Sequence, residues 1–219
     1  MVAVQLDLLL LAGYAGALCL VAFFSLLIAS AYRERSLYLH ALAVLLGVVS
    51  LSADVVAMPR GASRWLPEAA LLLVLALAAL ALRELVNHAG AMRGFRQALV
   101  GVGAVLPLVA VAGAVGGWSL LLPGTAAFAT VALLVMLRAW PQSQPWVWWL
   151  AASLLGLLLA AVGMGAGQLG ILPASSRLLG AALTLWAAGT YLAVVWRSRL
   201  FAETRVRVDA RKATDALTG

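Results

Sequence analysis

QALVGVGAVLPLVAVAGAVGGWSLLLPGTAAFATVALLVML, residues 97–137, is a stretch of 41 residues without a single charge. It is about twice as long as an α-helix needs to be to cross the hydrocarbon core of a bilayer. Gly-Gly-Trp at 116–118 supplies a turn and an aromatic side chain suited to the membrane surface. The stretch therefore predicts two spans, Ala98–Val115 and Trp118–Leu137, joined by a tight turn. A re-entrant pair is the alternative, and it would expose irregular backbone to lipid.

The rest of the chain has the same apolar character. Of its 219 residues 65% are hydrophobic and 11% charged, and the mean hydropathy is +1.05. Water-soluble domains have about 45–50% apolar and about 25% charged residues, so that class is excluded. The apolar runs are too long for the strands of a β-barrel and show no alternation. The expected fold is an all-α polytopic membrane protein, a bundle of seven transmembrane helices.

Seven apolar segments, each bounded by polar or charged residues, predict the spans of a domain covering residues 1–196. They are Leu6–Ala31, Ser36–Ala57, Pro67–Leu85, Ala98–Val115, Trp118–Leu137, Trp146–Gln168 and Leu178–Val195. Seven of the eight tryptophans lie at predicted span ends, which is typical of an interfacial belt. These segments leave no room for a separate catalytic domain.

The arginines predict the orientation of this bundle. Six stand in the first, third and fifth connections, namely Arg33, Arg35, Arg83, Arg93, Arg96 and Arg138. Three stand in the others, Arg60, Arg64 and Arg177. Because positive loops stay in the cytoplasm, we expect an outer N-terminus and a cytoplasmic C-terminus. The net charge of +7 is thereby explained by topology and lipid head groups, with no need for nucleic acid as a partner.

The segment after the last span, residues 197–214, is charged and amphipathic. Val206, Ala210, Ala213 and Leu217 recur at spacings of four, three and four, which is the pattern of a coiled-coil seam. One interpretation is a cytoplasmic signalling helix that pairs with a second copy in a homodimer. The other is a basic helix that lies on anionic lipid. The periodicity favours neither.

Asp215-Ala216-Leu217-Thr218-Gly219 resembles the D-x-L-T-G opening of a GGDEF (diguanylate cyclase) domain. The resemblance implies that residues 215–219 begin a truncated GGDEF domain and that the preceding helix couples the membrane bundle to it. Such a domain joins two GTP molecules into cyclic di-GMP, requires Mg²⁺ and acts as a homodimer. The G-G-D-E-F signature itself is absent, so residues 1–219 are expected to hold no catalytic site and no cofactor.

The membrane region resembles bacterial seven-span sensor modules of the 7TMR-DISM and MASE types. The similarity rests on Tyr32-Arg-Glu-Arg-Ser-Leu-Tyr-Leu-His40, a short basic turn that opens the second predicted span. The first span is predicted within a few residues of Met1, so we expect this chain to lack the folded extracellular domain usual in the 7TMR-DISM group. The resemblance implies a sensory domain in the bacterial inner membrane that responds to an unknown small ligand or other stimulus.

Asp54 is the carboxylate that the sequence places deepest in a predicted span, near its outer end. Arg60, Arg64 and Glu68 bracket the adjoining connection. Intramembrane carboxylates usually face the bundle interior or water, which favours a ligand- or proton-sensing pocket. The alternative is that Asp54 is an interfacial cap paired with Arg60 or Arg64.

The two histidines, His40 and His88, are both predicted near cytoplasmic span ends. A bis-histidine haem or metal site is one interpretation, and ordinary structural histidines are the other. Cys19 is the single cysteine, which excludes an intrachain disulfide and a cysteine-based zinc site. The lone lysine, Lys212, follows the last span, so no retinal Schiff base can form in the bundle.

A small polytopic transporter, or a membrane-bound protein that binds a substrate or lipid, is the competing function. Pro107 and the glycines of segment 163–170 could interrupt helices along a transport path. Gly163, Gly165 and Gly167 also have a simpler interpretation, since small residues allow helices to pack closely in membranes. The sequence shows no convincing inverted repeat.

Overall fold

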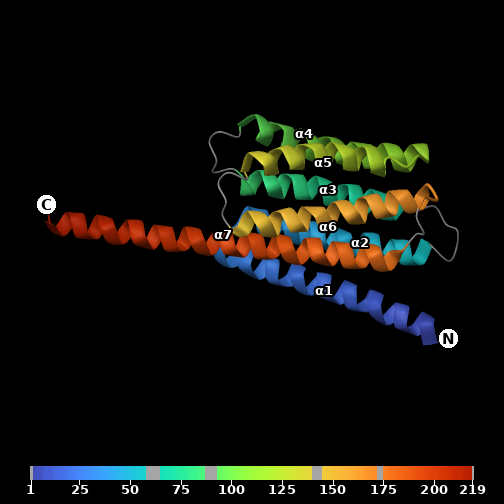
Figure 1. Ribbon diagram of the computed structural model, residues 1–219, viewed down its shortest axis with the longest axis horizontal. Helices are drawn as coiled ribbons and strands as arrows, with labels where there is room; N and C mark the ends of the chain where they lie inside the picture. Colours follow the sequence, from blue (N-terminus) through green and yellow to red (C-terminus); the bar gives the residue numbers. More distant parts are fainter. Residues whose placement is uncertain (1, 58–64, 87–92, 140–144, 172–174, 219) are drawn as a thin grey trace.

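The computed structural model describes residues 2–57, 65–86, 93–139, 145–171 and 175–218. Within these residues the chain forms seven α-helices and no strand (Figure 1). Their bounds are α1 Val2–Tyr32, α2 Arg35–Ala57, α3 Trp65–Leu85, α4 Arg93–Gly116, α5 Leu121–Ala139, α6 Pro145–Gln168 and α7 Ser176–Thr218.

Each of the seven helices is long and apolar enough to cross a membrane. The chain is therefore a multi-pass helical membrane protein, as its composition predicts. The uncharged stretch 97–137 forms two separate helices, α4 and α5, which confirms the paired spans. Three boundaries were predicted wrongly. Helix α4 begins at Arg93 rather than Ala98, and the last apolar span ends near Arg199 rather than at Val195. Helix α5 begins at Leu121, and Trp118 belongs to the turn that precedes it.

Successive helices run antiparallel, so the two termini lie at opposite ends of the bundle (Figure 1). We call the end from which α7 emerges the tail end; α2 and α4 begin there. We call the opposite end the head end; α3, α5 and α7 begin there. This arrangement fixes which connections are neighbours and therefore which polar side chains can meet.

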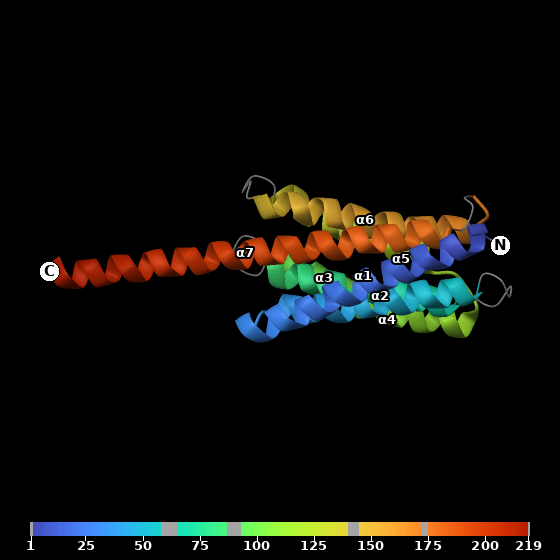
Figure 2. The same cartoon turned by 90° about the horizontal axis from the view of Figure 1, so that it is seen from below.

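Helix α3 forms the centre of the bundle and packs against α2, α4, α5 and α6. In its most apolar stretch 61% of the residues are buried, against 17% in α1 and 22% in α4. Lipid replaces water around such a bundle, so peripheral helices can leave apolar side chains exposed without penalty. Helix α1 lies at one edge of the bundle (Figure 1) and runs obliquely across α2 and α7 (Figure 2).

Three helices end in the same backbone motif, in which a residue with positive φ reverses the chain. Gly117 after α4 and Gly170 after α6 have φ of 68° and 70°. In both cases the next amide N–H donates to a carbonyl five residues earlier, Trp118 to Gly113 and Ile171 to Ala166. After α1 a non-glycine residue, Arg33 with φ 53°, takes this position, and Glu34 N donates to Ala29 O.

Helices α6 and α7 approach each other closely because glycines face the contact. A Cβ atom added at Gly156 would lie 3.0 Å from Ala182 O, and one at Gly189 would lie 2.9 Å from Ser153 Cβ. Gly163 faces Leu178 of α7. The prediction that the glycines of α6 serve close packing is confirmed at this position, and sequence reasoning missed Gly156 and Gly189.

Helix α7 continues as one unbroken helix from the bundle to Thr218 (Figures 1 and 2). Its apolar span ends near Arg199. The predicted boundaries at 197 and 215 therefore fall within a single helix. The side chains from 200 onward and Gly219 lie outside what the structure describes, and this group includes the predicted coupling residues Val206, Ala210, Ala213, Asp215, Leu217 and Thr218.

Candidate functional site

Helix α7 runs antiparallel along α2 and makes polar contacts with α2, and with the connection that precedes α2, at three levels of the bundle. From the head end to the tail end these polar pairs are Asp54 with Ser176, His40 with Ala187, and Glu34 of the connection with Arg197. Between the first two levels Gly47 faces Leu183. The constant antiparallel register shows that these contacts belong to one continuous interface. We call it the α2–α7 seam.

At the head end the hydroxyl of Ser176 donates a hydrogen bond of 2.7 Å to Asp54 Oδ2. Both residues are buried. Ser176 is the first residue of α7, so the carboxylate lies beside the positive end of that helix dipole, which stabilises negative charge there. Asp54 also lines a cavity of about 20 Å³ together with Ser175 and Leu178. That volume suits about one water molecule rather than an organic ligand.

Of the other members of the predicted sensing set, only Glu68 lies among the described residues. Arg60 and Arg64 lie outside the described residues, so neither the capping pair nor the pocket built with them can be placed. Glu68 lines a different cavity, which Asp54 does not line. Among the described residues, the polar partner of Asp54 is therefore Ser176 of α7, and Glu68 belongs to a separate site.

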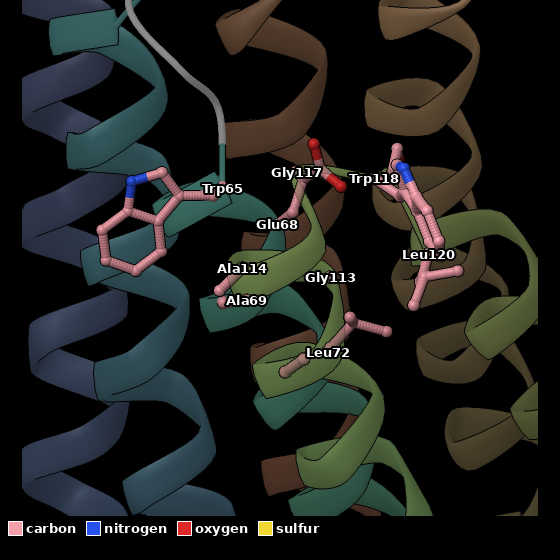
Figure 3. A pocket seen from close by; sticks show the side chains of 11 residues that line it. Trp65, Glu68, Ala69, Leu72, Gly113, Ala114, Gly117, Trp118 and Leu120 are labelled. Atoms are coloured by element: carbon pink, nitrogen blue, oxygen red, sulfur yellow. The ribbon is translucent and has the colours of Figure 1, made fainter.

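The Glu68 cavity lies at the head end, between α3, α4 and the turn before α5 (Figure 3). It measures about 200 Å³, and Trp65 and Trp118 form parts of its wall. Figure 3 shows the Glu68 carboxylate between the two indole side chains and near Gly117. A carboxylate flanked by aromatic rings can attract a small cationic group. The exposed Trp65 and Trp118 also fit the predicted interfacial belt.

In the middle of the seam His40 is buried and contacts the backbone of α7. Its Nε2 lies 3.1 Å from Ala187 O, and its ring meets the Trp186 ring edge-to-face at a centroid distance of 5.3 Å. A carbonyl can only accept, so Nε2 carries a hydrogen and donates it to Ala187 O. Nδ1 has no hydrogen-bond partner among the described residues.

The predicted pairing of His40 with His88 cannot be placed, because His88 lies outside the described residues. His40 instead lines a cavity of about 10 Å³ with Trp186 and Thr190, which leaves no space for a haem. Within the described part of the chain, no group of three or more His, Cys, Asp or Glu side chains is arranged to hold a metal ion.

At the tail end the side chain of Arg197 is only 5% exposed. Its NH1 atom lies 3.9 Å from Glu34 Oε1, and the Glu84 carboxylate adds to the electrostatic attraction. Ser36 donates a hydrogen bond of 2.9 Å to the same Glu34 oxygen. Because Glu34 stands in the backbone motif that ends α1, the connection between α1 and α2 determines where this carboxylate lies.

Sequence reasoning missed Arg197, because it follows Trp196 and was assigned to the charged tail. The helical spacing of the buried residues of α7 would have indicated that Arg197 faces the bundle. Thr190, Ala193 and Val194 are buried at helical spacing, and Arg197 continues the same face. Ser176 and Glu34 gave no comparable signal, since each gains its role from a partner that is distant in the sequence.

Comparisons of the chain with models of known protein families, with curated proteins and with solved structures find no match.

Proposed function

We propose that this chain is a signal-transducing membrane domain in which α7 is the output helix. The observation that carries the proposal is the α2–α7 seam: a single helix makes two buried polar contacts and one partly exposed ion pair, at three levels of the bundle, and then continues to Thr218. A continuous helix transmits a shift or rotation along its length. Any event that changes the seam therefore changes the position of the segment beyond Arg199.

Polar contacts suit this role because their net contributions are small and separable. A hydrogen bond contributes about 0.5–1.5 kcal/mol to stability. A signalling element requires two arrangements that differ by only a few kcal/mol, so that a stimulus can shift their populations. Asp54 at the head end and Arg197 at the tail end are the residues through which such a shift would be received and delivered.

The orientation and the output domain are further parts of the proposal. The arginine distribution supports an outer N-terminus and a cytoplasmic C-terminus in the bacterial inner membrane. The resemblance of Asp215–Gly219 supports a diguanylate cyclase as the domain that α7 controls. GTP and Mg²⁺ would belong to that domain, and its chemistry would require a homodimer.

Insertions in α7 test the coupling. The chain is fused after Gly219 to a diguanylate cyclase catalytic domain, and cyclic di-GMP is measured in membranes. Four residues inserted after Glu203 preserve the helical face to within about 40°, whereas two rotate it by about 200°. We expect output to tolerate four residues better than two. Equal output from both insertions would mean that α7 is a passive tether.

Two further measurements test the parts separately. Reporter fusions after Arg35, Arg93, Arg138 and Arg199 should read cytoplasmic, and an external reading after Arg199 would contradict the orientation. Sequencing the gene beyond codon 219 tests the cyclase: an Asn-Arg pair soon after Gly219 is expected. A stop codon there would refute the cyclase without affecting the seam.

A further inference from the structure

Three arginines line a groove at the tail end of the bundle, apart from the α2–α7 seam. The groove measures about 530 Å³ and lies between the end of α3 and the beginning of α4. Its lining residues are Arg83, Arg93, Arg96, Gln97, Val100 and Gly101. Figure 1 shows that α3 ends and α4 begins at the end from which α7 emerges. The groove is large enough for a phosphate-bearing head group.

The electrostatics of the groove favour an anion. Among the described residues, its lining holds three guanidinium groups and no carboxylate. Glu84, next to Arg83 in the sequence, has its Oε1 3.3 Å from Arg83 NH1. The connecting segment 86–92 contains no acidic residue. Arg96 Nε is buried without a hydrogen-bond partner among the described residues. Helix α4 begins at Arg93, so its positive dipole end adds to the attraction.

An apolar surface leads from the groove along α4. Gly101, Ala104, Leu108 and Val111 recur at spacings of three and four and are all exposed. A Cβ atom added at Gly101 would meet no atom within 4 Å, so the groove is open toward this stripe. The arginines lie at the end of the apolar span Arg93–Gly116, the level at which lipid head groups reside. A ligand with both a phosphate and an acyl chain matches this juxtaposition better than a free phosphate.

We propose that this groove binds an anionic phospholipid, with the phosphate between Arg93, Arg96 and Arg83 and an acyl chain along α4. Arginine suits this ligand because its planar guanidinium donates two parallel hydrogen bonds to phosphate oxygens. The site is distinct from the contacts that position α7 and stands independently of the proposed signalling function.

Lipid retention tests the site. The full chain is reconstituted in phosphatidylcholine nanodiscs that contain a minor fraction of phosphatidylglycerol, transferred to detergent, and weighed by native mass spectrometry. We expect the wild type to retain phosphatidylglycerol. Arg93→Gln combined with Arg96→Gln should weaken retention roughly 30-fold, since each arginine near the surface contributes about a factor of five. The matched control, Arg35→Gln with Arg138→Gln, removes two exposed charges at the same end outside the groove and should retain the lipid as the wild type does.

A second variant covers the case in which the double arginine variant does not fold. Gln97→Glu leaves every arginine in place and adds one negative charge at an exposed lining position, and it should also lower retention. Equal retention by Gln97→Glu and wild type, or equal losses in the two double variants, would overturn the proposal. Displacement of the lipid by inorganic phosphate alone would identify a soluble phosphate site and would likewise overturn it.

Discussion

Helix α7 packs against two neighbours by two kinds of contact. Toward α6 it meets glycines, and its backbone approaches so closely that an added Cβ at Gly156 would lie 3.1 Å from Trp186 N. Toward α2 it presents hydroxyl, carbonyl and guanidinium groups at intervals along the α2–α7 seam. The α6–α7 interface is held by close packing of complementary surfaces, and the α2–α7 seam by a few polar contacts that are separate from one another.

The difference indicates that the interface with α6 fixes the position of α7, whereas the contacts with α2 can be exchanged. Close packing of small residues is lost as a whole if the helices separate, because dispersion contacts fall off steeply with distance. Polar contacts can be exchanged one at a time, with water or another side chain as the new partner. We therefore expect α6 to hold α7 in place and α2 to bias its position, and four substitutions examine this comparison.

Gly156→Leu should have the largest effect, because it forces a branched side chain against backbone atoms of α7. We expect a loss of about 3 kcal/mol in the free energy of unfolding, measured by titration with sodium dodecyl sulfate in mixed micelles. Gly13→Leu in α1 is the control, since nothing lies within 4 Å of its added Cβ. A Gly156→Leu protein as stable as this control would show that the α6 contact is not tightly packed.

Glu34→Gln should come next, because it removes a negative charge beside the buried Arg197 guanidinium. The Glu34 side chain is 32% exposed and Glu84 still attracts the cation, so we expect about 2 kcal/mol rather than the full effect of breaking a buried pair. Arg35→Gln, an exposed change one residue away, should alter stability by less than about 0.5 kcal/mol. Similar losses of unfolding free energy in the two variants would show that Glu34 is not a specific partner of Arg197.

Asp54→Ala removes the acceptor of the Ser176 hydroxyl and should destabilise by about 1 kcal/mol. Asp7→Ala provides a matched comparison at the same end, because Asp7 forms an ion pair with Arg177 that is partly exposed. Exposed pairs contribute little, so the loss there should be close to zero. In the cyclase fusion, Asp54→Ala should shift output whereas Asp7→Ala should not; the reverse order would contradict the seam as the coupling element.

Arg33→Gly should have the smallest effect and the opposite sign. Arg33 adopts a positive φ that glycine accepts without steric penalty, so the substitution should stabilise the turn that holds Glu34 by about 0.5–1 kcal/mol. The expected readout is a higher midpoint in the same detergent titration. A lower midpoint would mean that the Arg33 side chain makes a contact worth more than the backbone strain.

The fold could be predicted from the sequence because lipid imposes one simple rule, that apolar runs of sufficient length become helices. That rule located all seven helices and divided residues 97–137 correctly. It missed the start of α5, because the backbone motif at Gly117 extends the turn beyond Trp118. The coupling prediction for Val206 and its seam concerns side chains outside the described set, and it stays a prediction.

The candidate site could be predicted only in part. Asp54 and His40 attracted notice as polar residues within apolar spans, and both lie in the seam. Asp54 contacts the hydroxyl of Ser176, and His40 contacts the backbone carbonyl of Ala187. Both partners belong to a helix that is distant in the sequence, and neither has a sequence signature. Arg197 was missed for a related reason: composition marks a charged tail, but only three-dimensional packing decides which of its charges is buried.

The burial of Arg197 at the point where α7 leaves the bundle restricts how the helix can move. A piston stroke toward the head end would carry its guanidinium into the apolar interior, where a centrally placed arginine is disfavoured by at least about 2.5–3.5 kcal/mol. A stroke in the other direction would only release it from Glu34 to the surface. Arg197 therefore makes axial sliding of α7 asymmetric: it opposes movement toward the head end more strongly than movement toward the tail end.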